Sequence, residues 1–126
     1  MLNAAFLTLA TAVLLGTALA FLYLRTETGL PAPWQLATFH GLLGIAGLSC
    51  LLLALRGPST GLDQRNGSFE VMSAILFALA ALVGVGIFIT HLLKRRRAGT
   101  LIAIHATLAV SGFVTLLAYL FAGSAS

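Results

Sequence analysis

The chain has 126 residues, of which 60% are hydrophobic and only 8% are charged, whereas an ordinary soluble domain has about 25% charged residues. A chain of this composition cannot cover its own surface with polar groups, which excludes a water-soluble monomer. The single cysteine and the scattered glycines also exclude disulfide-stapled and collagen-like folds. The composition therefore predicts an integral membrane protein.

Four uncharged stretches lie between the charged residues, and each reaches the length of about 20 apolar residues that a helix needs to cross a membrane. In chain order, the predicted transmembrane helices cover residues 2–24, 34–55, 71–93 and 100–122. None of them alternates apolar and polar residues as the strands of a membrane barrel do. The loops are short, so the sequence predicts one all-α membrane domain over residues 1–126, a four-helix bundle in up-down-up-down order.

The first predicted helix contains Ala18-Leu19-Ala20, which resembles a signal-peptidase site. The positive residues that precede the apolar segment of a signal peptide are missing, and the apolar run continues to Leu24. We therefore expect the first helix to remain in the protein.

Positive residues divide unequally between the two ends of the predicted bundle. Arg25 and Lys94–Arg97 lie in the first and third loops, whereas the second loop has Arg56 and Arg65 beside two acidic residues. Because loops rich in Lys and Arg stay in the cytoplasm, both termini are expected outside it. A basic run can also contact nucleic acid, but in a tight loop we interpret it as a topology signal that attracts anionic lipid, and we expect no nucleic-acid partner.

The second and fourth predicted helices match each other at an offset of 65 residues. Phe39–Leu48 reads FHGLLGIAGL and Ile104–Phe113 reads IHATLAVSGF, so a histidine, a leucine and a glycine coincide. The match is informative because it aligns a rare polar residue with a glycine seven positions later.

The first and third helices match less strongly, at an offset of 68 residues. The matched pairs are Ala10/Ala78, Ala12/Ala80, Leu14/Leu82, Gly16/Gly84 and Leu24/Leu92. Together the two matches predict a duplicated helical hairpin, with repeat halves 1–57 and 68–122 and a pseudo-twofold axis along the membrane normal. The second and fourth helices are then diagonal partners.

Two of the three histidines occupy the matched positions. His40 lies about six residues into the second helix and His105 about five into the fourth, so both lie roughly 8–9 Å inside their helix starts. Ionisable groups inside a bilayer are costly and indicate function. We expect the two imidazoles to face each other at one depth. His91, close to Lys94, is interpreted as an interfacial residue and as a substitute ligand.

Two imidazoles that face each other suit the iron of a haem, which takes axial nitrogens from both sides. The expected axial ligands are His40 and His105. One helical turn beyond them lie Gly44 and Ala109, which leave room for a flat macrocycle. The glycines two turns on and the aromatic residues expected near its edge are Gly47, Gly112, Phe39, Phe88 and Phe113. The cytoplasmic cations expected to meet its propionates are Arg95, Arg96 and Arg97.

Other interpretations stay open. Small residues in membrane helices serve close packing, and a membrane histidine can hydrogen-bond to a neighbouring helix without any cofactor. The predicted spans contain no Asp, Glu, Lys, Arg or helix-breaking proline, so neither a charge-coupled pump nor a transporter site is indicated. Cys50 is expected to be an inert thiol in apolar surroundings.

The segments Phe39–Gly44 and Ile104–Ala109 place histidines on facing membrane helices near one surface. In this plan the chain resembles small b-type cytochromes of the cytochrome b561 kind. The resemblance implies haem b and single-electron exchange with a quinol or a redox protein. Members of that group bind two haems through four histidines, whereas this chain has three, so one bis-histidine haem is expected. The chain is also similar to small bacterial four-helix membrane proteins with a repeated His-Gly-Leu-Leu segment, which implies a bacterial inner membrane.

Two hypotheses of function follow. The first is a haem b electron carrier, with its haem near the cytoplasmic face. The second is a cofactor-free membrane subunit or scaffold that packs against a larger complex or another copy of itself through its Gly/Ala faces. We do not expect an enzyme, and if the chain is redox-active, we expect a b-type cytochrome.

Overall fold

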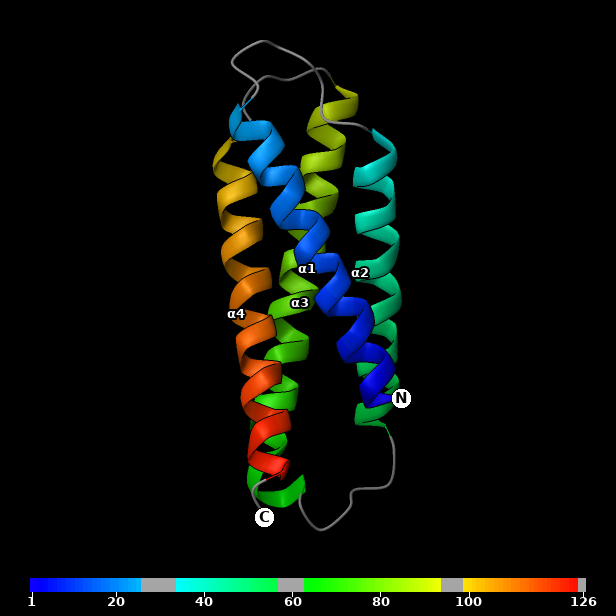
Figure 1. Ribbon diagram of the computed structural model, residues 1–126, viewed down its shortest axis with the longest axis vertical. Helices are drawn as coiled ribbons and strands as arrows, with labels where there is room; N and C mark the ends of the chain where they lie inside the picture. The colour runs from blue at the N-terminus through cyan, green and yellow to red at the C-terminus, as the bar shows by residue number, and fades with distance from the viewer. Residues whose placement is uncertain (26–33, 57–62, 94–98, 125–126) are drawn as a thin grey trace.

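The computed structural model describes residues 1–25, 34–56, 63–93 and 99–124, and these parts of the chain form four helices and no strand. The helices are α1 (Leu2–Arg25), α2 (Trp34–Leu55), α3 (Asp63–Leu92) and α4 (Gly99–Ser124). They run alternately in opposite directions, and both chain termini lie at the same end of the bundle (Figure 1). Each helix is long and apolar enough to cross a membrane. The predicted all-α membrane bundle is confirmed.

The helix boundaries agree with the sequence except at the start of α3. This helix begins at Asp63, eight residues before the predicted start at Val71, and the part apolar enough to span begins at Ser68. The expectation that no span contains a charged residue is therefore wrong, because Glu70 lies in this part and is only 7% exposed. A charge marks the edge of the apolar segment but does not end a helix. The 30 residues of α3 extend about 45 Å, about the thickness of a bilayer with its headgroup regions.

The bundle consists of two close hairpins that meet less extensively. α1 packs against α2 and α3 against α4, while α2 with α3 and α1 with α4 form the smaller contacts between the hairpins. Within the described parts of the chain, the backbones of α1 and α3, and of α2 and α4, do not approach closely. These are the diagonals of a square, as short connections between consecutive helices predict.

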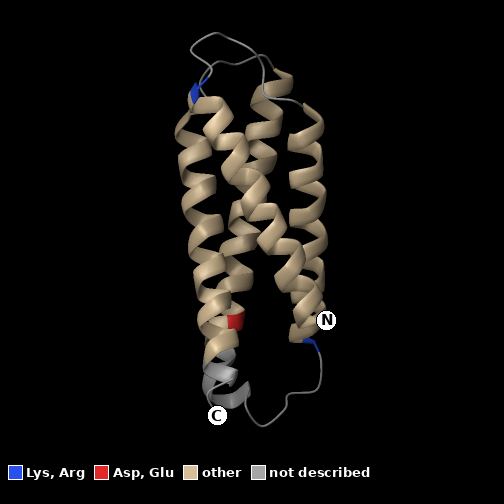
Figure 2. Cartoon of the chain, viewed as in Figure 1, with Lys and Arg blue, Asp and Glu red and all other residues tan. Residues whose placement is uncertain are grey.

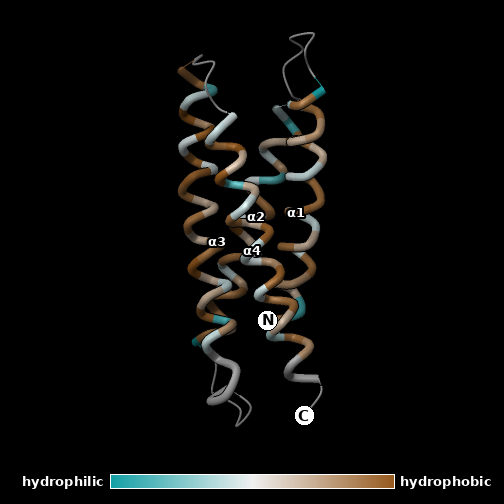
Figure 3. Tube along the Cα trace, turned by 90° about the vertical axis from the view of Figure 1, so that its left-hand side faces the viewer, coloured by the Kyte–Doolittle hydropathy of each residue, from teal (hydrophilic) through white to brown (hydrophobic). Residues whose placement is uncertain are grey.

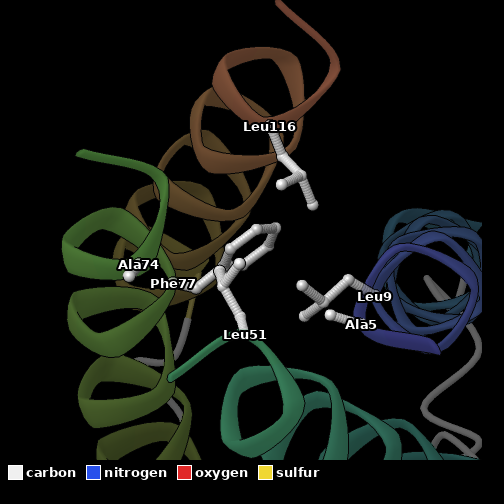
Figure 4. Packing of buried hydrophobic residues seen from close by; sticks show 6 residues of the cluster. All are labelled: Ala5, Leu9, Leu51, Ala74, Phe77 and Leu116. Atoms are coloured by element: carbon white, nitrogen blue, oxygen red, sulfur yellow. The ribbon is translucent and has the colours of Figure 1, made fainter. Parts of the chain in front are cut away.

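A hydrophobic core fills the half of the bundle that holds the termini. Leu9, Leu51, Phe77 and Leu116 come from the four different helices and point toward a common centre (Figure 4). The three leucines are at most 1% exposed. Beside them Phe6 stacks on a phenylalanine of α4. Lipid is as apolar as leucine, so this core stabilises the bundle through close packing rather than through transfer out of water.

Two glycines allow the helices of each hairpin to approach closely. A Cβ atom placed on Gly47 would lie 2.6 Å from Cγ of Leu9, and one on Gly112 would lie 3.3 Å from Cδ2 of Phe77. The close approach at Gly112 also lets the buried Ser73 hydroxyl donate a hydrogen bond of 2.9 Å to its carbonyl oxygen. The spacing suggested that both glycines border a macrocycle. In the structure a neighbouring helix fills the space beside each, so they are packing residues.

Polarity is confined mainly to the ends of the bundle. In the described parts of the chain, charged residues lie toward the two ends (Figure 2), and hydrophobic residues dominate the helices between them (Figure 3). At one end the Arg25 guanidinium carbon lies 4.2 Å from the centroid of the Phe21 ring, and Trp34 is exposed. Aromatic and positive side chains of this kind anchor helices in the headgroup region.

Candidate functional site

A histidine pair joins the two hairpins across the diagonal of the bundle. His40 follows Trp34, the first residue of α2, by six positions, and His105 follows Gly99, the first residue of α4, by six positions. Both therefore lie about 9 Å inside their helices. Their Nε2 atoms are 3.4 Å apart. The structure thus brings together the two histidines that the sequence match singled out, at equal depth and with their Nε2 atoms opposed.

The other ring nitrogen of each histidine bonds to the backbone of the neighbouring helix in its own hairpin. His40 Nδ1 lies 2.8 Å from the carbonyl oxygen of Ala12 in α1, and His105 Nδ1 lies 2.7 Å from that of Ala80 in α3. A carbonyl oxygen can only accept, so each Nδ1 carries the proton and donates it. In a neutral ring Nε2 is then the acceptor, with its lone pair directed outward.

The two Nε2 atoms consequently face each other as acceptors. Two lone pairs at 3.4 Å repel unless a proton or a metal ion lies between them. Imidazole nitrogens bind metals at about 2.0–2.1 Å, which places the nitrogens of a linear pair about 4 Å apart. The rings need to separate by only about 0.6 Å to hold a metal ion.

Metal-binding histidines also make hydrogen bonds of this kind. Such histidines donate the second ring N–H to a carbonyl or carboxylate, which orients the ring and raises its basicity. Sequence reasoning missed these acceptors because every residue carries a carbonyl. The only available signal was the weak match of Ala12 with Ala80, the two residues that supply the oxygens.

Glycines at a second matched pair make room for the rings. His40 lies against Gly16 of α1, and His105 lies against Gly84 of α3. The contacts of one hairpin therefore recur in the other at the offsets of 65 and 68 residues found in the sequence.

The described residues bring two imidazole nitrogens together at this site. In the part of the chain that the structure describes, no group of three or more His, Cys, Asp or Glu residues could hold a metal ion. His91 is exposed in the last turn of α3, seven residues beyond Gly84 and so about 10 Å farther along the helix. It is not beside the pair. Among metals that take two opposed imidazole nitrogens is the iron of haem, whose other ligands come from a macrocycle.

The remaining candidate residues differ in their surroundings. A Cβ atom placed on Gly44 would have no neighbour within 4 Å, and Ala109 is half-buried. Phe39 and Phe88 are exposed. Phe113 stacks on a phenylalanine of α1 in the core, with ring centroids 5.7 Å apart. The predicted propionate partners Arg95, Arg96 and Arg97 lie outside the described residues.

Fold and site together define a small integral membrane protein, a four-helix bundle whose hairpins meet through a histidine pair near one end. No protein-family model, curated protein or solved structure matches the chain. Its function is therefore inferred from the site itself.

Proposed function

We propose that this protein is a haem b electron carrier in which His40 and His105 are the axial ligands of one haem. The observation that carries the proposal is the opposed pair of Nε2 acceptors, 3.4 Å apart. Each is oriented by a hydrogen bond from the other ring nitrogen to a backbone carbonyl. A purely structural histidine needs no such opposed lone pairs, and an iron ion between them removes their repulsion.

A bound haem supplies an iron that takes up and releases one electron. The chain orients the two ligands through the carbonyl oxygens of Ala12 and Ala80, and these hydrogen bonds increase the electron donation of the imidazoles. One turn from the ligands, Gly44 has no side chain and Ala109 has only a methyl group. The core around Leu51 closes the opposite half of the bundle, which keeps water from reaching the ligands through the bundle from that end.

The recurring contacts support a duplicated origin for the two hairpins. Each half contributes one histidine, one carbonyl acceptor four residues before a glycine, and that glycine. A haem offers its iron on two similar faces, so it suits a site between two similar hairpins. A quinol or a small redox protein at the same membrane face is the proposed electron partner.

The absorption spectrum of the purified protein tests the proposal. We expect protein expressed with an adequate haem supply and solubilised in detergent to show the low-spin spectrum of a b-type cytochrome, with one haem per chain. Because both axial positions are occupied, carbon monoxide should bind the reduced protein only weakly. A colourless protein that also fails to bind added haemin would overturn the assignment.

The second candidate function is a cofactor-free subunit of a larger membrane complex. The observation in its favour is the open space beside Gly41, where a Cβ atom would have no neighbour within 4 Å. A helix of another protein, or of a second copy, can approach closely at such a position. The same spectrum separates the two candidates, because a scaffold has no pigment.

We also propose that the histidine end of the bundle faces the cytoplasm. Five of the seven positive residues are Arg25, the last residue of α1, and Lys94–Arg97, which lie in the sequence between α3 and α4. Reporter tags fused at Met1 and Ser126 should therefore both report from outside the cytoplasm. In a Cys50→Ala background, a single cysteine introduced between Lys94 and Gly99 should react only with reagents supplied from the cytoplasmic side. Labelling of that cysteine from outside would contradict the orientation, and termini on opposite sides would contradict the four-span arrangement.

A further inference from the structure

Each histidine ring lies directly on the backbone of the neighbouring helix, at a glycine. A Cβ atom placed on Gly16 would lie 2.8 Å from Cε1 and 3.3 Å from Nδ1 of His40. A Cβ atom placed on Gly84 would lie 3.2 Å from Cε1 and 3.4 Å from Nδ1 of His105. Real Cβ contacts essentially never fall below 3.0 Å, so a side chain at Gly16 requires the His40 ring to move.

The hydrogen bond and the glycine contact come from the same helical turn. Ala12 precedes Gly16 by four residues, and Ala80 precedes Gly84 by four. In an α-helix the carbonyl of each alanine also accepts the amide of the glycine one turn later. One turn of the neighbouring helix therefore holds each ring in two places. The alanine carbonyl oxygen accepts the hydrogen bond from Nδ1, and the glycine lies against Cε1. We call the two sets, Ala12/Gly16 and Ala80/Gly84, the ring clamps.

The two ring clamps hold the imidazoles almost perpendicular to each other. The planes of His40 and His105 make an angle of 83°, with ring centroids 5.7 Å apart. Each clamp belongs to a different hairpin, so the angle between the rings follows from the packing of the hairpins. Rotating either ring toward a parallel arrangement strains its hydrogen bond to the carbonyl.

We propose that Gly16 and Gly84 are positioning residues that fix the imidazole planes, and that the haem of the proposed function is held between perpendicular axial rings. This inference rests on the proposed function, because its spectroscopic consequence requires a bound haem. Two iron d orbitals can overlap with the π orbitals of the axial imidazoles. Parallel imidazoles both interact with the same one of these d orbitals and therefore separate the two in energy. Perpendicular imidazoles interact with one d orbital each, which leaves the two d orbitals nearly equal in energy. The ferric haem then gives a highly anisotropic low-spin electron paramagnetic resonance (EPR) signal instead of the rhombic signal of parallel rings.

Alanine substitutions at the clamp glycines test this inference on the full-length, haem-loaded protein. We expect the oxidised wild-type protein to show the highly anisotropic signal. Gly16→Ala should lower its largest g value toward the rhombic range, because His40 must rotate. Gly84→Ala should cause a smaller change in the same direction, because its Cβ contact is longer. Gly86→Ala is the matched control: it lies in α3 two residues beyond Gly84, where a Cβ atom meets nothing within 4 Å, and it should keep the wild-type signal.

The outcomes separate this inference from the haem proposal. A rhombic signal from the wild-type protein, or clamp variants identical to Gly86→Ala, would refute the ring clamps and leave the haem in place. Absence of haem would refute the proposed function alone, because the clamps can also be measured without it. In the haem-free protein, ¹⁵N chemical shifts should show Nδ1 protonated in both histidines, and Gly16→Ala should alter the shifts of His40 but not those of His105. Unchanged His40 shifts in that variant would refute the clamp.

Discussion

Replacing either His40 or His105 by alanine is expected to abolish the low-spin haem spectrum, because each change would remove one of the two proposed axial ligands of the iron. The histidine that remains would bind iron from one side only, so any haem retained should become high-spin and bind carbon monoxide readily when reduced. Absorption spectra of the purified variants at equal protein concentration measure the effect. His91→Ala is the matched control and should keep the wild-type spectrum, since His91 lies exposed at the end of α3.

A methionine at position 40 provides a sharper variant of this experiment. A haem held by one histidine and one methionine stays low-spin and has a raised reduction potential. His40→Met should therefore keep a low-spin spectrum, with a potential above that of the wild-type protein in a redox titration. If the pair is purely structural, its removal costs only about 0.6–2 kcal/mol of interhelical hydrogen bonding, and no spectrum exists to change. A low-spin spectrum that survives both alanine substitutions would contradict the ligand assignment.

Replacing Gly47 by leucine is expected to destabilise the bundle strongly. Even a Cβ atom at this position would lie 2.6 Å from Cγ and 2.8 Å from Cδ2 of Leu9. Leu9 is 1% exposed and packs in the core, so it cannot move aside, and α1 and α2 must separate. Overpacking of this kind costs about 1–3 kcal/mol, which lowers the folded-to-unfolded ratio roughly 5- to 150-fold. Unfolding in mixed micelles with increasing sodium dodecyl sulfate, followed by circular dichroism, measures the difference.

The matched control is Gly41→Leu in the same helix. A Cβ atom at Gly41 meets nothing within 4 Å, so the added side chain extends into open space while the helix gains the same leucine. We expect this variant to unfold at the same detergent fraction as the wild-type protein or at a higher one. A Gly47→Leu variant as stable as Gly41→Leu would show that the hairpin does not depend on this close approach.

The sequence by itself determined the class of the protein and its four spans. A bilayer allows a chain to cross it only as closed barrels or as apolar helices of about 20 residues, so length and hydropathy were enough to predict α2 with its observed bounds. They did not predict the start of α3 at Asp63, because a helix can continue past its last apolar residue into the headgroup region. The match at an offset of 65 also singled out His40 and His105, since a polar residue that recurs within apolar spans is rare.

Only the tertiary structure decided how these residues meet. The helices are apolar on all sides, so hydropathy does not specify how each is rotated about its axis or which glycine faces a neighbour. Packing of α1 on α2 turns Gly47 toward Leu9 and Gly16 toward His40, and it distinguishes both from Gly41 on the open side. The carbonyl oxygens of Ala12 and Ala80 carry no sequence signal, because every residue has one. They became hydrogen-bond acceptors for the histidines only where helix packing brought a ring nitrogen within 2.8 Å of each.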